Sequence, residues 1–283
     1  MRINDKETVA VVVPLYKSWL SDDEKISLRH LYKYLGEYDK YLLIPQKLNA
    51  HLDGFESKRF PDHYFRGKHT YNSLLVEKKF YKSFKDYKYI LIYQLDCLVF
   101  SNQLEKWCQR DYDYIGAPWL KEEGKNTHVD QESVGNGGFS LRKIDSFLKV
   151  LDKHNSVLNN IKRLCNSIFN ILIALDLRTR IKKLVKAIIK GSSLASVHKK
   201  TSKIINKAIL KKYIDYRNED LFWSFEAAKY VPNFKVASVN DALQFAFEVN
   251  PKVCFKRNNE CLPFGCHAWN KYDRDFWEPY LLV

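Results

Sequence analysis

The sequence is poor in glycine and lacks the glycine-rich motifs of common nucleotide-binding folds. Ten of its 283 residues are glycine, whereas 14% are aromatic, a composition typical of a packed globular protein and not of a disordered chain. The N-terminal third contains neither G-x-G-x-x-G nor G-x-x-x-x-G-K followed by Ser or Thr. The sequence therefore gives no motif evidence for a dinucleotide-binding or a P-loop protein.

The cysteines also form no recognisable framework. They stand at positions 97, 108, 165, 254, 261 and 266, without the spacing of a disulfide scaffold and with no signal peptide before them. We therefore expect reduced thiols in a cytosolic protein. A zinc site is disfavoured because no familiar ligand spacing is matched by Cys254, Cys261, Cys266 and His267.

The net charge of +14 comes almost entirely from one segment. Residues 152–215 hold 15 Lys or Arg against 3 Asp, so they carry +12 of it. Apolar residues recur in this segment at three- and four-residue steps, which predicts amphipathic helices with lysine-rich polar faces. We therefore divide the chain into one α/β domain, residues 1–151 and 213–283, and a basic helical insertion, residues 152–212.

Basic amphipathic helices are attracted to anionic lipid headgroups, so we expect residues 156–212 to bind an anionic membrane surface. The alternative is a helical hairpin that packs on the α/β domain and leaves its lysines solvated. The longest apolar run, Ile171–Leu175, is far too short to span a bilayer, and we expect no transmembrane helix. No recognised motif supports nucleic acid as a partner.

The N-terminal part predicts a strand, a helix and a second strand. An apolar stretch within residues 8–16 ends at Pro14, Ser21 and the acids after it cap a helix that ends at Gly36, and a second strand ends at Pro45. This order predicts a parallel βαβ unit with a right-handed crossover. A short strand at residues 55–60 and one helix over residues 70–84 complete the N-terminal part.

The chain is organised around an apolar strand that ends in an acid. Five apolar residues, Tyr89–Tyr93, are followed by Gln94, Leu95 and Asp96. Such a run predicts a strand buried on both faces, and ligands of open α/β sheets collect at the carboxyl ends of strands. An unpaired Asp is costly to desolvate there, so Asp96 should be paired or bind a metal. The alternative role is a capping Asp.

Three later motifs carry further candidates. The glycines of residues 134–142 permit close approach of the backbone to a ligand, although a tight turn or bulge explains them as well. Glu219 and Asp220 stand at a predicted helix start, where acids also act as ordinary caps. His267 lies in Pro263–Trp269 between glycine and aromatic residues, and a lone His there can equally be a packing residue.

In this order the motifs resemble GT-A type nucleotide-sugar glycosyltransferases. The resemblance is closest to a bacterial family known only as a domain of unknown function and found among surface-polysaccharide genes. It covers residues 8–150 and 213–270 and implies a Rossmann-like GT-A fold: a single α/β catalytic domain with a mixed, mostly parallel central sheet and a helical insertion. The Asp-x-Asp triplet of GT-A enzymes is here Gln94-Leu95-Asp96, so only its last acid is kept.

The resemblance also implies roles for single residues. Asp96 and His267 would bind Mn²⁺ or Mg²⁺. Asp220 and Glu219 would be the catalytic acids, with Asp220 as the general base of an inverting reaction and Glu219 either capping the helix or orienting the acceptor. Donor contacts are expected from Pro14, Tyr16, Asn72, Gln94, Asp96, Gly137 and Gly138. Acceptor contacts are expected from Trp119, Asn136 and Trp269.

The leading functional hypothesis is a glycosyltransferase that moves a sugar from a nucleotide-sugar donor to a glycan or lipid-linked acceptor in bacterial surface polysaccharide or lipopolysaccharide synthesis. It would be cytoplasmic and peripheral on the inner membrane face. A non-catalytic module that binds a nucleotide sugar or a polyanion is the alternative, which the incomplete Asp-x-Asp suits. A nucleotidyltransferase on a related sheet is a weaker third, because a glycine-rich phosphate loop is missing after the first strand.

Overall fold

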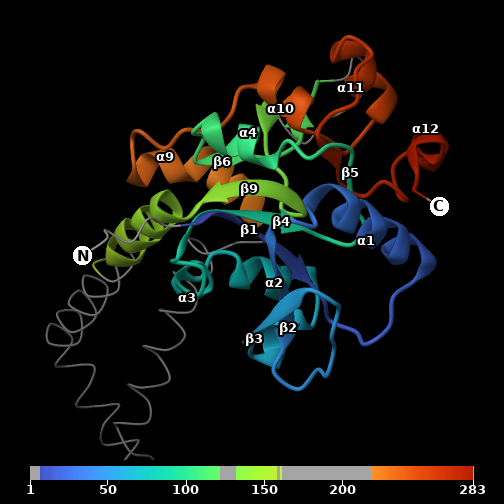
Figure 1. Ribbon diagram of the computed structural model, residues 1–283. Helices are drawn as coiled ribbons and strands as arrows, with labels where there is room; N and C mark the ends of the chain where they lie inside the picture. The colour runs from blue at the N-terminus through green and yellow to red at the C-terminus, as the bar shows by residue number, and fades with distance from the viewer. Residues whose placement is uncertain (1–6, 122–131, 158–159, 161–217, 283) are drawn as a thin grey trace, which may run out of the picture. The chain divides into compact units, whose positions relative to one another are not determined.

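The computed structural model describes residues 7–121, 132–157, 160 and 218–282 (Figure 1). Residues 144–157 are helical. The other helices and strands of the described residues are β1 (Glu7–Pro14), α1 (Asp22–Leu35), β2 (Asp39–Pro45), β3 (Phe55–Phe60), η1 (Asp62–Phe65), α2 (Lys68–Leu74), α3 (Lys78–Lys82), β4 (Tyr87–Tyr93), β5 (Leu98–Val99), α4 (Leu104–Gln109), β6 (Tyr114–Ile115), β7 (Pro118–Trp119), β8 (Ser133–Val134), β9 (Phe139–Lys143), α8 (Glu219–Leu221), the π-helix η2 (Phe222–Glu226), α9 (Ala227–Tyr230), α10 (Val239–Phe245), β10 (Ala246–Phe247), α11 (Pro251–Arg257), β11 (Gly265–Cys266), α12 (Arg274–Trp277) and η3 (Glu278–Tyr280).

The central sheet has six strands in the order β3-β2-β1-β4-β9-β6. β1 pairs in parallel with β2 and with β4, and β2 pairs in parallel with β3. β9 is antiparallel to both of its neighbours. The predicted α/β fold with a mixed, mostly parallel sheet is therefore confirmed, and so is the parallel βαβ unit at its start.

The sheet is covered by helices on both faces, which is why its central strands are almost entirely apolar. One face of β1, β4 and β9 packs on α1, α4 and α10 and forms the main core with Leu31, Leu35, Leu104, Trp107 and Phe245. α2 and α3 lie on the other side of the sheet (Figure 1). There the Arg142 guanidinium of β9 donates a hydrogen bond to the Tyr81 hydroxyl of α3.

Local sequence explains α1 well. Ser21 Oγ accepts the Glu24 N–H at 3.3 Å, and the Glu24 carboxylate accepts the Ser21 N–H at 2.7 Å, which is the capping box that the sequence predicts. The single helix predicted over residues 70–84 is wrong, because the chain forms α2 and α3 with a break between them. At the break the Tyr81 hydroxyl donates to the carbonyl of Leu75, which replaces helical bonding.

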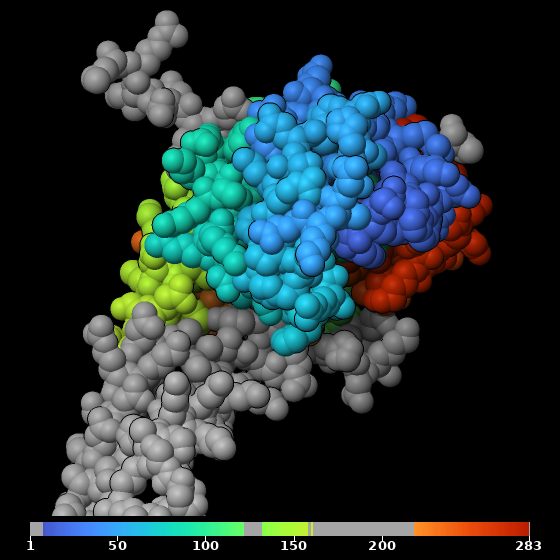
Figure 2. Space-filling model, turned by 90° about the horizontal axis from the view of Figure 1, so that it is seen from below, coloured from blue at the N-terminus to red at the C-terminus, as the bar shows by residue number. Residues whose placement is uncertain are grey.

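The C-terminal residues lie against α1, as the red and blue surfaces in Figure 2 show. Arg274 forms an ion pair with Asp23 at 3.0 Å, and the backbone N–H of Leu282 donates to His30 Nε2 at 3.0 Å. A small sheet, β10-β11-β5, continues this region. It carries the segment around His267 back to the carboxyl end of β4, where Trp269 N donates to the carbonyl of Asp96.

The chain divides into two compact units, residues 1–151 with 217–283 and residues 152–216. Apart from residues 152–157 and 160, the predicted insertion at 152–212 lies outside the described residues. The membrane surface predicted for residues 156–212 falls there as well. None of the described helices combines the length and hydrophobicity needed to cross a bilayer.

Candidate functional site

A cavity of about 690 Å³ opens at the carboxyl ends of β1 and β4. Residues 14–17 follow β1 and residues 94–96 follow β4, and both segments line it. β2 and β3 lie on one side of β1, and β4 lies on the other. The cavity between β1 and β4 is therefore at the point where the strand order reverses. This is the position at which open α/β sheets bind their ligands.

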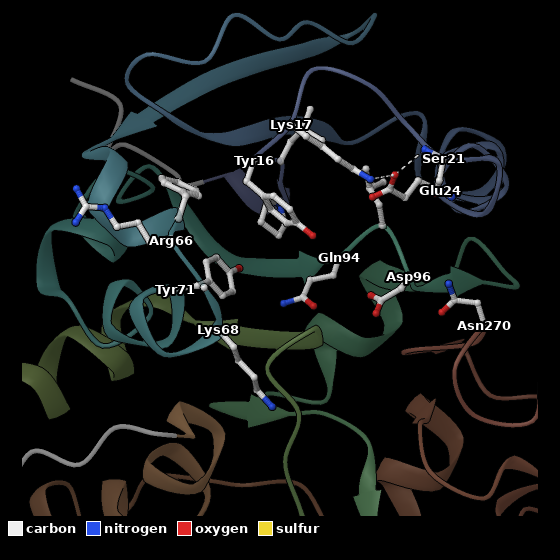
Figure 3. A pocket seen from close by; sticks show the side chains of 15 residues that line it. Tyr16, Lys17, Ser21, Glu24, Arg66, Lys68, Tyr71, Gln94, Asp96 and Asn270 are labelled. Atoms are coloured by element: carbon white, nitrogen blue, oxygen red, sulfur yellow. Dashed lines mark hydrogen bonds and ion pairs between the residues drawn. The ribbon is translucent and has the colours of Figure 1, made fainter.

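The walls of the cavity bring aromatic and cationic groups together. Figure 3 shows Tyr16 and Lys17 on one side, Lys68 and Tyr71 of α2 on another, and Gln94 and Asp96 between them. Tyr16 is 65% exposed, so its ring is free to meet a ligand. Lys17 forms an ion pair with Glu24 at 2.7 Å. The full lining is Pro14, Leu15, Tyr16, Lys17, Ser21, Glu24, Phe65, Arg66, Gly67, Lys68, Tyr71, Gln94, Leu95, Asp96 and Asn270.

Asp96, which lines the cavity, lies next to His267, which is outside the lining. His267 Nε2 lies 3.4 Å from Asp96 Oδ1 and 3.3 Å from Gln94 Oε1. Asp96 Oδ1 is buried and has no hydrogen-bond partner among the described residues. It is within ion-pair distance of His267, which attracts it only if the imidazole is protonated. The resemblance implied a shared role for these two residues, and the structure brings them together.

Glu248 holds the other side of the His267 ring. Glu248 Oε1 lies 2.8 Å from His267 Nδ1. Burial lowers the pKa of the His267 imidazole, but the hydrogen bond and charge of Glu248 outweigh it, so that this pKa is raised above its usual value. Burial likewise raises the pKa of the Glu248 carboxyl, and the bond from His267 more than reverses that effect. The two groups therefore stabilise each other as an ion pair.

The donor set suits a hard or borderline divalent cation. Asp96 supplies an oxygen without a partner, His267 supplies Nε2, and their atoms lie within 4.8 Å of each other and of Cys97 Sγ. Cys97 is a poor third ligand, because burial raises the pKa of its thiol well above the usual range and keeps it protonated. One imidazole with oxygen ligands fits Mn²⁺ better than Ca²⁺.

Glu219 is not available for chemistry. Its carboxylate is 2% exposed and pairs with Arg142, 0% exposed, at 2.9 Å between Oε1 and Nη2. Burial raises the pKa of the Glu219 carboxyl, and the Arg142 guanidinium opposes that rise. This ion pair argues against the role in catalysis or acceptor binding predicted for Glu219: the side chain is an internal counter-ion beneath the glycine-rich turn, residues 135–138.

Asp220, the next residue, is in a different environment. It begins α8 with Glu219 but is only partly buried, and its Oδ1 accepts the N–H of Leu221 at 3.0 Å. Desolvation raises the pKa of this carboxyl, the charge of Glu248 adds to the rise, and Lys68 opposes it.

Several residues predicted to contact substrate are instead part of the framework. Trp269 is 0% exposed and packs in a core cluster with Leu98 and Trp277, so it offers no surface to an acceptor. Asn136 is 2% exposed, and its Oδ1 accepts the N–H groups of Gly138 and Phe139. Their burial argues against a direct contact of either side chain with an acceptor.

The two glycines assigned to the donor make room for protein groups. A Cβ at Gly138 would stand 2.1 Å from His267 Nε2, and one at Gly137 would stand 2.5 Å from Glu219 Oε1. Asn72 is buried and does not line the cavity, because α2 turns Lys68 and Tyr71 toward it instead. Trp119 is half-buried and stacks on Phe225, with ring centroids 6.0 Å apart.

Sequence reasoning missed three charged residues of the site, Arg66, Lys68 and Glu248. Arg66 and Lys68 look like surface residues in a polar loop, and nothing local shows that the start of α2 and the residues before it reach the cavity. Glu248 had a usable signal: it follows the apolar stretch Phe245-Ala-Phe247, as Asp96 follows β4. An acid after an apolar run predicts a site residue in both places.

Comparison with solved structures gives distant similarities. A glycosyltransferase involved in the glycosylation of the major capsid of PBCV-1 aligns over 96% of this chain and 98% of its own, with 9% identity and a TM-score of 0.42. The apo-form glycosyltransferase GlyE of Streptococcus pneumoniae TIGR4 aligns over 98% of this chain and 60% of its own, with 12% identity and a TM-score of 0.40. A 4-diphosphocytidyl-2C-methyl-D-erythritol synthase from Anaerococcus prevotii aligns over 53% of this chain and 76% of its own, with 6% identity and a TM-score of 0.33. At these values the function must be argued from the site.

Among curated proteins no sequence matches this chain. A family model does match, over residues 54–267. The match runs from the start of β3 to His267 and takes in Asp96, the glycine-rich turn and Asp220. Because it covers well over half of the chain, the predicted membership of a family known only as a domain of unknown function is confirmed. The chain belongs to the family described as "Protein of unknown function (DUF5672)".

Proposed function

We propose that this protein is a glycosyltransferase that takes a nucleotide sugar as donor and a glycan or lipid-linked glycan as acceptor. The observation that carries the proposal is the cavity of about 690 Å³ at the strand-order reversal, whose lining includes an aromatic side chain, cations and Asp96, with His267 next to Asp96. Its size and its mixed lining suit a ligand with a base, a sugar and a charged diphosphate.

The cations of the cavity suit the diphosphate. Arg66 and Lys68 come from one short segment and line the same wall. Among the described residues neither has an acidic partner within ion-pair distance, so their charges are available to phosphate oxygens. Tyr16, on the opposite wall, offers an exposed ring to a nucleobase.

Asp220 is the group best suited to accept the acceptor hydroxyl proton. Its carboxyl is partly desolvated and its pKa is raised, which moves a carboxylate toward the basicity that proton transfer near neutral pH requires. Glu219 cannot take this role from within its ion pair with Arg142. The proposal therefore gives the reaction one base, Asp220, and assigns it an inverting course.

A divalent cation fits the proposal. Asp96 and His267 would hold Mn²⁺ or Mg²⁺, which would supply positive charge for the leaving diphosphate. Lys68 would add charge on the protein side of the same group. The basic segment 156–212 would bring the enzyme to anionic membrane surfaces at the inner face of a bacterial membrane, where surface polysaccharide acceptors are made; the support for this part is its sequence charge alone.

The test is a panel of nucleoside diphosphates and nucleotide sugars, each measured by thermal shift and calorimetry with and without Mn²⁺. A ligand that binds the native state raises its stability by about 2.7 kcal/mol at one hundred times its Kd. We expect stabilisation by one nucleotide class and, with its sugar donor, transfer or slow hydrolysis of the sugar. Binding without any turnover of the bound donor would favour the non-catalytic binding module. No binding by any member would refute the proposal.

A further inference from the structure

His267 sits between groups that decide which of its nitrogens carries the proton. A carboxylate only accepts hydrogen bonds, so Glu248 Oε1, 2.8 Å from Nδ1, requires a proton on Nδ1. Asn136 Nδ2 is also 3.0 Å from Nδ1. The amide of Asn136 is fixed by its Oδ1, which accepts the N–H groups of Gly138 and Phe139, and its NH₂ group bonds Glu248 as well. Glu248 thus accepts both donors.

The opposite nitrogen faces only acceptors. Asp96 Oδ1 lies 3.4 Å from Nε2 and Gln94 Oε1 lies 3.3 Å from it, and Asp96 Oδ1 has no hydrogen-bond partner among the described residues. In the neutral imidazole with its proton on Nδ1, three electron-rich atoms therefore converge on one point. Such an arrangement is stabilised by a positive charge between them, either a proton on Nε2 or a cation.

The fold holds this geometry in place. β10 and β11 pair in parallel with Phe247 opposite Cys266, so Glu248 and His267 are the next residues of the two strands and emerge side by side. The N–H of His267 donates to the carbonyl of Phe247 at 2.9 Å. The ring rests on Gly138, where a Cβ would be 2.1 Å from Nε2. The imidazole therefore has little room to turn away.

We propose that Glu248 is a positioning residue for a divalent cation: it fixes His267 with the proton on Nδ1, so that Nε2 offers its lone pair to a cation shared with Asp96. This inference rests on the proposed function, which assigns Asp96 and His267 to that cation. Residues that orient a ligating histidine through its second nitrogen commonly change metal affinity by about 10- to 100-fold.

The test uses Mn²⁺ alone as the probe and needs no sugar donor. Calorimetry measures Mn²⁺ affinity, and ¹⁵N NMR of histidine-labelled protein reports the tautomer of His267 above the pH at which it titrates. For Glu248→Ala we expect Mn²⁺ affinity to fall about 10- to 100-fold and the proton to leave Nδ1 for Nε2 in part of the molecules. Glu56→Ala, which removes an exposed acid on β3, should change neither result.

Glu248→Gln keeps an oxygen that can accept the Nδ1 proton but loses the charge. We expect it to retain the tautomer and to lose less affinity than Glu248→Ala. If Glu248→Ala fails to fold, judged by circular dichroism, this variant carries the test, with an expected several-fold loss of affinity. Wild-type affinity and an unchanged tautomer in the folded variants would overturn the inference.

Failure of the inference and failure of the proposed function are distinguishable. If the wild-type protein binds no Mn²⁺, the inference and the metal part of the proposed function both fall. Nucleoside diphosphate binding and sugar transfer without metal would still support a glycosyltransferase in that case. Conversely, Mn²⁺ binding that depends on Glu248, with no nucleotide bound by the loaded protein, would keep the inference and refute the transferase.

Discussion

Glu219 and Arg142 form an ion pair that is almost completely removed from solvent. The carboxylate accepts hydrogen bonds from Nη2 at 2.9 Å and Nη1 at 3.3 Å, and the same guanidinium donates to the Tyr81 hydroxyl. The pair joins β9, α8 and α3 beneath the glycine-rich turn. A buried pair of this kind adds little to folding stability compared with apolar residues of similar size. The loss of one partner, however, leaves the other charge buried without a counter-ion.

The first prediction is that the main effect of Glu219→Gln is a loss of folding stability and not a loss of sugar transfer by the folded protein. Arg142 would keep its charge without a counter-ion, so the free energy of unfolding should fall by about 3–5 kcal/mol. Urea denaturation measures the change. The double variant Glu219→Leu with Arg142→Leu removes both charges and should recover much of the loss, since the effects of residues in contact do not add.

The opposite pattern would contradict this assignment. If Glu219→Gln kept wild-type stability while sugar transfer disappeared, Glu219 would have the catalytic role that its ion pair argues against.

The second prediction concerns Gly138, which the His267 ring covers. An added methyl group would stand 2.1 Å from Nε2, so Gly138→Ala should displace the imidazole and weaken Mn²⁺ binding at least tenfold. Calorimetry with Mn²⁺ checks this. Glu56→Ala, on β3 and outside the cavity lining, is again the control and should leave Mn²⁺ affinity unchanged. Equal affinity in Gly138→Ala and wild type would show that Nε2 is not a ligand.

Sequence reasoning succeeded where the cause of the structure is local. The core of β4 is the continuous apolar run Tyr89–Tyr93, and the capping box of Ser21 and Glu24 spans four residues, so both can be recognised without knowing the fold. The break between α2 and α3 was missed because tertiary burial on both helices decides it. Leu74 and Tyr81, one on each side of the break, are both fully buried.

The site shows the same division. Asp96 and His267 were assigned through the order of motifs, whereas the burial of other assigned residues depends on contacts between distant residues. Trp269 and Asn136 look like exposed motif residues in sequence, yet the sheets around them bury both. Lys68 reaches the cavity only because the fold brings the start of α2 to the residues that follow β1 and β4. No pattern within a few residues of it records that arrangement.

The third prediction is a pH dependence of stability from His30. Its Nδ1 is 2.8 Å from the carbonyl of Val99, and Nε2 accepts the N–H of Leu282. Burial lowers the pKa of this imidazole. The unfolded chain, with a pKa of about 6.5, then binds more protons, so the stabilisation is present above about pH 6.5 and is lost as pH falls toward the folded pKa.

His30→Gln should remove that contribution. The free energy of unfolding should fall less between about pH 7.5 and 5.5 in the variant than in the wild type. The raised pKa of His267 acts in the opposite direction but is common to both chains, so the difference between them isolates His30. Parallel pH profiles for the two proteins would contradict the assignment.

The fourth prediction tests the cation of α2. Lys68→Met should weaken nucleoside diphosphate binding on the order of tenfold, because an ammonium group that meets phosphate oxygens is lost. The affinity of the variant should depend less on salt concentration than that of the wild type, because one fewer charged group, which salt would screen, contacts the ligand. Lys106→Met, on α4 and outside the cavity lining, should bind as the wild type does. Calorimetry at two salt concentrations gives both answers.

The last prediction separates an enzyme from a binding module. Asp220→Asn keeps the size of the side chain and the oxygen that accepts the Leu221 N–H, but the amide cannot take a proton at neutral pH. We therefore expect donor and Mn²⁺ affinities close to those of the wild type and a fall in single-turnover transfer of roughly 10² to 10⁴. Asp275→Asn, which removes a carboxylate on α12, should transfer at the wild-type rate. Transfer at the wild-type rate by Asp220→Asn would exclude Asp220 as the base. Glu219 is held by Arg142 and could not replace it. The proposed inverting reaction would then have no proton acceptor among the described acids that we assign to catalysis.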